Sequence, residues 1–299
     1  MTSVYNRRMN DSQEIGLVGI GLLGTALAER LLARGFDVLG FDIRETQSAH
    51  LVELGGRASE SSRQVMCECE TTIWCLPTSD QSAALADELL ETASGSGRII
   101  DTTTGDPAQM QSIAHRLQSN QVEYLDATVA GSSQNVRRGE GVLMVGGPPA
   151  AFAACQPIFA AIAPKVFHLG PSGSGAKMKL VVNLVLGLQR AVLAEGLGFA
   201  EALKIDLNQA LSVLKSGPAY CRSMDTKGEN MIARSYKPQA RLNQHKKDVG
   251  IILQTGQDSS AQLPLSTIHE LLLQQAVELG YGEQDNCSIF EAFRQSQSD

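Results

Sequence analysis

The chain has 299 residues, which is enough for about two domains; 43% are hydrophobic and 19% are charged, as in ordinary globular proteins. Its net charge of −7 argues against binding to nucleic acids or to anionic membrane surfaces, because both need clustered Lys and Arg. No unbroken apolar run reaches the roughly 18 residues of a membrane-spanning helix, so the sequence predicts no membrane partner.

The first residues and the cysteines indicate the compartment. Residues 1–13 are polar and lack the apolar segment of a signal peptide, so we interpret them as a flexible leader. None of the six cysteines forms a C-x-x-C pair. Cys67 and Cys69 are separated by one residue, with no histidine near them, which is a poor arrangement for a metal. We therefore predict reduced cysteines, no metal site and a cytoplasmic protein.

Strand and helix patterns alternate through the first 170 residues. Short apolar runs predict strands at 14–19, 36–42, 71–77, 96–103, 122–130, 141–147 and 165–170. Helical spacing of apolar residues predicts helices at 25–35, 46–54, 79–93, 107–120 and 149–163. Such alternation is typical of βαβ units and of a mostly parallel sheet.

The pattern changes after Gly175. Residues 176–203 have no strand signal and read as one long helix that is apolar on most faces, and further helices follow at 206–217 and 264–280. We predict an α/β domain over residues 14–171 and an all-helical domain over residues 172–299, joined by the long helix. Because so apolar a helix in a small domain usually also packs against a partner, we expect a homodimer or homotetramer.

A glycine loop between the first strand and the first helix predicts dinucleotide binding. Gly19 permits a tight turn, Gly21 lets a pyrophosphate approach the backbone, and Gly24 lets the helix pack closely on the sheet. The second strand ends at Asp42, whose carboxylate can accept hydrogen bonds from the ribose hydroxyls. The sequence therefore predicts a Rossmann-type, doubly wound sheet. The cofactor-binding candidates of this loop are Gly19, Ile20, Gly21, Leu22, Leu23 and Gly24.

The choice between the two nicotinamide cofactors depends on Asp42 and Arg44. The Asp42 carboxylate repels a 2′-phosphate and favours NAD, whereas the Arg44 guanidinium could pair with that phosphate. Arg44 can equally be a solvated surface charge. We predict NAD, with NADP possible.

A bound nicotinamide needs a group that handles the proton accompanying the hydride. Of the five histidines, only His245, beside Lys246, is in a suggestive place. Lys179 and Asn183 are four residues apart in the long helix, so both project from one face. A lysine in so apolar a helix either extends its amine to solvent at the helix end or is desolvated, with a lowered pKa suited to proton transfer.

The chain resembles the β-hydroxyacid dehydrogenase family, which includes 3-hydroxyisobutyrate dehydrogenase and tartronate semialdehyde reductase. The likeness covers nearly all of residues 14–295. Six segments carry it in order: GIGLLG (19–24), CLPTSDQ (75–81), DTTTGDP (101–107), DATVAGSSQNVRRGEGVLMVGG (126–147), GSGAKMKLVVN (173–183) and HKKDVGII (245–252).

The resemblance implies a role for each matching residue. Lys179 would be the general acid/base, with Asn183 as its hydrogen-bonding companion, and Gly131 would meet the substrate carboxylate through its backbone N–H. Asp248 would support the local fold. Further cofactor-binding residues would be Thr104 near the nicotinamide, Leu76 and Pro77 near the adenine side, and Lys247.

The chain departs from the family pattern near the substrate. Ala130 stands where the family has a serine, so Ala130, Gly131 and Ser132 replace its S-G-G, and Ser132 or Ser133 could substitute for the lost hydroxyl. Val182 replaces the first of two asparagines. These changes lie in the segments that resemble the substrate-binding half of the family pattern, and they leave the cofactor-binding half intact.

The sequence therefore predicts an oxidoreductase that transfers hydride between NAD(P) and a small 3-hydroxy acid or its semialdehyde or keto partner. The substrate would carry a carboxylate and lie between the two domains. One alternative is an imine reductase on the same scaffold, for which the resemblance implies Asp or Tyr at the Lys179 position and NADPH as cofactor. Another is a dinucleotide-binding protein without catalysis, which only Ala130 and Val182 support.

Overall fold

The computed structural model describes residues 14–91 and 97–294, so the leader predicted at 1–13 lies outside the described residues. Contacts within the chain divide it into two units: the first ends at Met178 and the second begins at Lys179. The domain boundary predicted between residues 171 and 172 stays a prediction.

The first unit is built on one sheet, whose described strands follow the order β3-β2-β1-β4-β5-β6-β7-β8. The strands are β1 (Glu14–Val18), β2 (Asp37–Phe41), β3 (Arg57–Ala58), β4 (Thr71–Trp74), β5 (Arg98–Asp101), β6 (Glu123–Ala130), β7 (Val142–Gly146) and β8 (Lys165–His168). Neighbouring strands are parallel except for the antiparallel pair β6 and β7. The first six strands have the order of doubly wound dinucleotide-binding folds, which confirms the predicted fold class.

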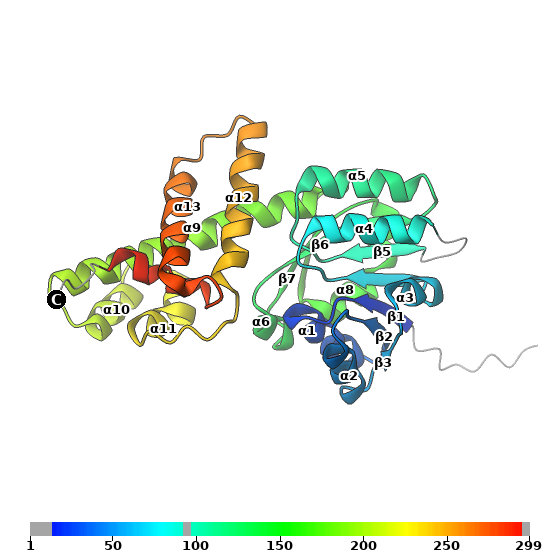
Figure 1. Ribbon diagram of the computed structural model, residues 1–299, viewed down its shortest axis with the longest axis horizontal. Helices are drawn as coiled ribbons and strands as arrows, with labels where there is room; N and C mark the ends of the chain where they lie inside the picture. Colours follow the sequence, from blue (N-terminus) through cyan, green and yellow to red (C-terminus); the bar gives the residue numbers. More distant parts are fainter. Residues whose placement is uncertain (1–13, 92–96, 295–299) are drawn as a thin grey trace, which may run out of the picture. The chain divides into compact units, whose positions relative to one another are not determined.

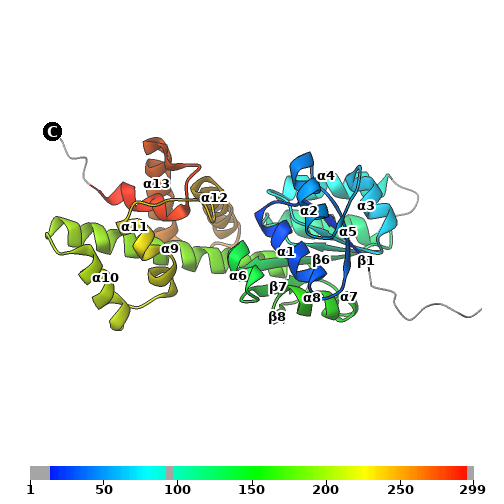
Figure 2. The ribbon, with the colours of Figure 1, turned by 90° about the horizontal axis from the view of Figure 1, so that it is seen from below.

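Helices cover both faces of this sheet (Figures 1 and 2). They are α1 (Leu22–Leu32), α2 (Glu45–Glu53), α3 (Ser62–Glu68), α4 (Ser79–Leu90), α5 (Pro107–Gln118), α6 (Ser133–Arg137), α7 (Pro149–Ala154) and α8 (Gln156–Ile162). Because successive strand residues point to opposite faces, Ile73 belongs to one buried core, with α1 and α8, and Trp74 to another, with α3, α4 and α5. Figure 1 shows α4 and α5 side by side on their face of the sheet.

Three short elements, β3, α3 and α6, have no counterpart among the predicted elements, since two to seven residues carry little periodic signal. The helix predicted over 149–163 is two helices, α7 and α8, which meet at Cys155. Pro157 explains the break: proline lacks an N–H and is favoured in the first turn of a helix, where α8 places it.

The second unit is helical, as predicted. It consists of most of α9 (Ser174–Ala202), then α10 (Leu207–Ser216), a π-helical turn (Met224–Gly228), α11 (Glu229–Ile232), α12 (Leu242–Asp258), α13 (Pro264–Ala276), a second π-helical turn (Val277–Tyr281) and a 3₁₀ helix (Asn286–Phe293). Its core combines apolar residues from several of these elements, among them Leu197, Val249, Leu273 and Phe290.

The long helix α9 is apolar enough, by length and composition alone, to cross a membrane, with a mean hydropathy of 1.5 over an 18-residue window. Length and composition alone do not test the expectation drawn from unbroken apolar runs. The central helix of a water-soluble domain passes the same test, and α9 supplies Leu193, Ala194 and Leu197 to the core of the second unit. The absence of a membrane partner stays a prediction.

Candidate functional site

The glycine loop follows β1 and leads into α1. Gly19 has a positive φ of +95°, and a Cβ there would lie 2.3 Å from the carbonyl oxygen of Cys75. A Cβ at Gly24 would lie 2.0 Å from the carbonyl oxygen of Gly19. Neither position can therefore carry a side chain without moving the backbone. Gly21 differs, because no heavy atom lies within 4 Å of the position that its Cβ would occupy.

The open position at Gly21 is the test of whether a dinucleotide fits. Gly21 is the N-cap of α1 and provides no side-chain cap for the first turn. The amino end of the helix, with its partial positive charge, thus faces open space, and a methyl group at position 21 would project into that space. These features fit a pyrophosphate, which binds helix amino ends through backbone N–H groups. Which loop residues touch the cofactor stays a prediction.

Asp42 is tied to this loop. One carboxylate oxygen accepts the Ile20 N–H at 2.8 Å, and the other accepts the Arg44 N–H at 2.9 Å and pairs with the Arg44 guanidinium at 3.3 Å. A carboxylate has about four acceptor positions, so at least one remains for a ribose hydroxyl. The Asp42 side chain is only 8% exposed, whereas that of Arg44 is 59% exposed, which leaves Arg44 able to reach a 2′-phosphate.

The further residues predicted to bind the cofactor, Leu76, Pro77 and Thr104, follow two neighbouring strands. The Leu76 N–H, just after β4, donates to the Thr103 hydroxyl after β5 at 3.1 Å, and the Thr102 hydroxyl donates to the Trp74 carbonyl at 2.8 Å. Leu76 and Thr104 are partly exposed and Pro77 is exposed. The carboxyl ends of parallel strands are where ligands of this fold bind, which accords with the predicted cofactor residues here.

The turn after β6 carries the predicted carboxylate-binding group. Ala130 is the last residue of β6, and the exposed Gly131 has a φ of +129°, a conformation that favours glycine. Ser132 caps α6 with Asn135: its N–H and its hydroxyl both donate to Asn135 Oδ1, at 3.0 and 2.7 Å, and its oxygen accepts the Asn135 N–H. The Ser132 hydroxyl proton is therefore engaged within the turn, and the substitution of Ser132 for the serine lost at position 130 stays a prediction.

In the second unit, Lys179 and Asn183 lie one turn apart on α9. Asn183 is buried, and its amide donates to Asp248 Oδ2 on α12 at 2.9 Å. The other oxygen of Asp248 lies 3.3 Å from the ammonium nitrogen of Lys247. The structure thus brings Asn183, Lys247 and Asp248 together, and Asp248 links the two helices rather than serving α12 alone.

Burial and neighbouring charges set the proton affinities of this group. Burial lowers the pKa of Lys179 from its ordinary value of 10.5; the Asp248 carboxylate opposes this shift, and the Arg190 charge adds to it. Burial raises the pKa of Asp248, against the opposing effects of Lys247 and Lys179. A lysine whose pKa is lowered by desolvation is suited to accept and return a proton near neutral pH.

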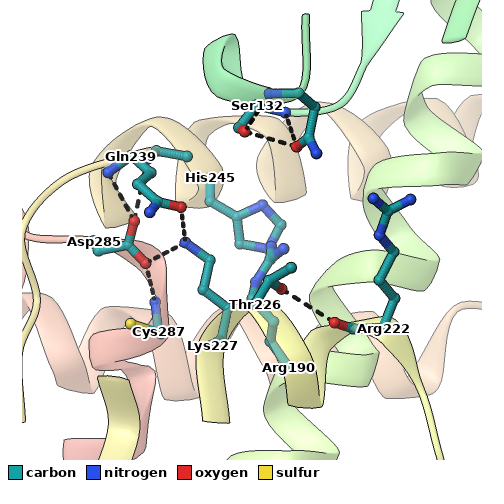
Figure 3. Close-up of polar contacts among 11 residues, drawn as sticks. Ser132, Arg190, Arg222, Thr226, Lys227, Gln239, His245, Asp285 and Cys287 are labelled. Carbon is teal, nitrogen blue, oxygen red and sulfur yellow. Dashed lines mark hydrogen bonds and ion pairs between the residues drawn. The ribbon is translucent and has the colours of Figure 1, made fainter. Parts of the chain in front are cut away.

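Sequence reasoning missed Arg190 and left His245 without a function. Arg190 lies eleven residues after Lys179 on α9, and its guanidinium is 3.0 Å from His245 Nε2 (Figure 3). Because a guanidinium can only donate, Nε2 accepts, and the His245 proton is on Nδ1. The spacing along the helix could have revealed Arg190, because positions 179, 183, 187 and 190 fall on one helix face.

Metal chemistry finds no support among the described residues, where no group of three or more His, Cys, Asp or Glu side chains could hold an ion. Burial raises the pKa of Cys69 and Cys155 to about 12 and that of Cys75 to about 11. These thiols are therefore protonated at neutral pH and are poor ligands and poor nucleophiles.

Comparison with known proteins covers both halves of the chain. Residues 14–170 match the sequence model of the NAD-binding domain of 6-phosphogluconate dehydrogenase, and residues 173–293 match that of the NAD-binding region of NADP-dependent 3-hydroxyisobutyrate dehydrogenase. The chain is 29% identical to glyoxylate/succinic semialdehyde reductase 1 of Arabidopsis thaliana, covering 94% of this chain and 98% of the relative. It is 27% identical to 2-(hydroxymethyl)glutarate dehydrogenase of Eubacterium barkeri, covering 96% and 97%.

Among solved structures, a 3-hydroxyisobutyrate dehydrogenase from Salmonella typhimurium has the same fold. It superposes with a TM-score of 0.85 at 23% identity and covers 93% of this chain and 99% of that one. An imine reductase from a Pseudomonas species superposes less well, with a TM-score of 0.63.

Proposed function

The chain belongs to the β-hydroxyacid dehydrogenase family and is an NAD(P)-dependent oxidoreductase acting on CH–OH groups, and we propose that its substrate is a small 3-hydroxy acid or the matching semialdehyde. Lys179 transfers the hydroxyl proton. The observation that carries this proposal is the desolvated Lys179 amine, one helical turn from an asparagine that Asp248 holds in place.

NAD(P), when bound, supplies the carbon that accepts or donates hydride, and the protein handles the proton. During oxidation, the neutral Lys179 amine accepts the proton of the substrate hydroxyl. During reduction, the Lys179 ammonium returns it to the new alkoxide. Lowering of the Lys179 pKa by burial keeps the amine partly neutral at a pH where an exposed lysine would be fully charged.

Asn183 orients the reacting hydroxyl. An amide has two N–H donors and one acceptor oxygen, and Asp248 uses only one of the donors. The remaining donor and the oxygen are available to the substrate hydroxyl. Asp248 fixes which end of the amide faces α12, because a carboxylate accepts only from the NH₂ end.

The carboxylate of the substrate is assigned to the backbone N–H of Gly131. The exposed turn at Gly131, with its positive φ, leaves the backbone accessible, and the next residue, Ser132, forms a capping box with Asn135. This assignment follows the family resemblance, and it needs no hydroxyl at position 130.

We also propose that the protein self-associates through α9. Large apolar side chains of this helix are exposed to solvent, among them Val181, Val185, Val192 and Phe199. Exposed apolar residues gathered on one helix mark association surfaces. Light scattering on the purified protein tests this: a monomer at micromolar concentration would contradict it. A cytoplasmic location remains a prediction from the reduced cysteines.

The direct experiment is a panel of small hydroxy acids and semialdehydes offered with NAD or NADP, followed by the absorbance of the reduced nicotinamide. We expect turnover of at least one 3-hydroxy acid, and a preference for NAD. Binding of NADH without turnover of any compound would favour a non-catalytic protein. Reduction of cyclic imines with NADPH, without activity on hydroxy acids, would favour an imine reductase.

A further inference from the structure

Arg190 is a cation without a carboxylate of its own. In the described part of the chain, its guanidinium makes one hydrogen bond, to the neutral His245 Nε2 at 3.0 Å, and no carboxylate oxygen lies within ion-pairing distance of it. Burial lowers the pKa of Arg190 to about 10, although nearby acids oppose the shift. A guanidinium has five N–H donors, so most of its binding capacity is unused.

The acids near Arg190 are already engaged by other groups. Asp285 pairs with the Lys227 ammonium at 2.7 Å and accepts three backbone N–H groups, an arrangement that Figure 3 shows in part. Asp248 accepts the Asn183 amide and pairs with Lys247. Because a desolvated charge without a hydrogen-bonded counter-charge is costly to keep, Arg190 is better explained by a ligand than by the stability of the fold.

A second observation concerns His269 on α13. Its side chain is buried, the residue being only 2% exposed, and neither ring nitrogen has a hydrogen-bond partner among the described residues. Burial lowers its pKa to about 4, so the ring is neutral. Its ring centroid lies 5.2 Å from that of His245. Gly187 leaves room for both rings, since a Cβ there would lie 2.6 Å from each of them.

We propose that Arg190, with His245 and His269, binds a second carboxylate of the substrate, so that the enzyme prefers hydroxy dicarboxylic acids and their semialdehyde partners. The inference rests on the proposed function, because it places this carboxylate at the far end of a substrate whose hydroxyl lies at Lys179 and Asn183. The four residues Gly187, Arg190, His245 and His269 are called the Arg190 cluster below.

Spacing along α9 sets the length of the substrate. Gly187, beside which the imidazoles lie, is one turn or about 6 Å beyond Asn183. About four or five zigzag carbon–carbon bonds of roughly 1.5 Å each span this distance. The hydroxyl carbon, the distal carboxylate carbon and the chain between them then account for about five or six carbons. With the first carboxylate added, the substrate is a hydroxylated diacid of about six or seven carbons.

The charge of the Arg190 cluster favours a carboxylate over a phosphate. Arg190 carries one positive charge, and both imidazoles are neutral, because burial lowers the pKa of each. A carboxylate matches the planar guanidinium through two parallel hydrogen bonds and brings one negative charge. A phosphate monoester brings nearly two and would leave charge uncompensated.

Calorimetric binding to the protein saturated with NAD tests the inference without requiring turnover. The probes are glutarate, pentanoate as its monocarboxylate counterpart, and 4-phosphonobutanoate. We expect glutarate to bind at least about 10-fold more tightly than pentanoate, the contribution of one charge-assisted hydrogen-bonded pair. Arg190→Gln removes this preference, whereas Arg241→Gln, which removes an exposed charge at the start of α12, keeps it.

The possible outcomes distinguish the diacid inference from the proposed function. Equal binding of glutarate and pentanoate by the wild-type protein overturns the inference, even if Arg190→Gln cannot be folded. Tighter binding of 4-phosphonobutanoate than of glutarate overturns the carboxylate assignment. A glutarate preference that depends on Arg190, in a protein that oxidises no hydroxy acid, supports a carboxylate site at Arg190 and refutes both the proposed function and the assignment of that carboxylate to a hydroxy diacid. Oxidation of hydroxy acids without any preference for diacids supports the proposed function and refutes the diacid inference.

Discussion

Replacement of Gly187 by alanine tests how tightly the Arg190 cluster is packed. The new Cβ would lie 2.6 Å from His245 Nε2 and 2.6 Å from His269 Cε1, closer than side-chain atoms approach each other. At least one imidazole must move, and His245 is held by Arg190. Overpacking of this kind costs about 1–3 kcal/mol. Alanine regains about 1 kcal/mol of helix propensity over glycine, so the net destabilisation is about 0–2 kcal/mol.

Gly196 is the matched control on the same helix. No heavy atom lies within 4 Å of the Cβ position there, so Gly196→Ala gains the helix propensity without a clash. We expect this variant to be about 1 kcal/mol more stable than the wild type, which raises the unfolding temperature by roughly 2–4 °C for a chain of this size. The two variants thus differ by about 1–3 kcal/mol.

Differential scanning calorimetry of both variants gives the comparison directly. The order expected is Gly196→Ala above the wild type, with Gly187→Ala equal to it or below. If Gly187→Ala is stabilised as much as Gly196→Ala, the imidazoles do not fill the space beside Gly187, and the packing of the Arg190 cluster described above is wrong.

Three further predictions concern the cofactor and the start of α9. Gly21→Ala should change the free energy of unfolding by less than about 1 kcal/mol but weaken NAD binding at least about 10-fold, because the new methyl group enters the open space at the amino end of α1. Unchanged NAD affinity in a titration would contradict this. Asp42→Asn keeps an acceptor for the Ile20 N–H and removes the charge that disfavours a 2′-phosphate. The ratio of kcat/KM for NAD to that for NADP should therefore fall about 10-fold, and an unchanged ratio would mean that residues other than Asp42 set the cofactor preference. The Asp126 carboxylate accepts the backbone N–H groups of Gly173 and Ala176 at 2.6 and 2.7 Å, and Asp126→Asn leaves one acceptor oxygen for the two. We expect the free energy of unfolding, measured with denaturant, to fall by about 1–2 kcal/mol. An unchanged free energy would mean that α9 does not depend on this cap.

Most of the fold could be predicted because its signals are local. The alternation of strand and helix, the glycine loop and the long apolar helix each lie within a few turns of sequence. Proline rules should have divided the helix over 149–163, since Pro157 lies in its middle. The two residues of β3 could not be predicted, because they pair with β2 without any alternation of their own.

The candidate site was less predictable, since its residues meet only in three dimensions. The Lys179–Asn183 spacing is visible in the sequence, but the Asn183–Asp248 bond joins residues that are 65 positions apart. Arg190 could have been noticed as a charge on the face of Lys179. The absence of a carboxylate partner for Arg190 could not be predicted, because the sequence does not show that Asp248 pairs with Lys247 and Asp285 with Lys227.

The central claim is that the Lys179 amine carries the substrate proton, and the pH dependence of kcat in Lys179→Met and in its control Lys177→Met tests it most directly. Lys177 is exposed on the same helix but two residues away, so it projects from another face. For the wild type and Lys177→Met, we predict that oxidation accelerates as pH rises and the amine loses its proton, and levels off below the ordinary lysine pKa of 10.5. For Lys179→Met, we predict a kcat lower by about 10²–10⁴, no such rise, and unchanged NAD affinity. A Lys179→Met enzyme with the rate and pH profile of the wild type would contradict the account.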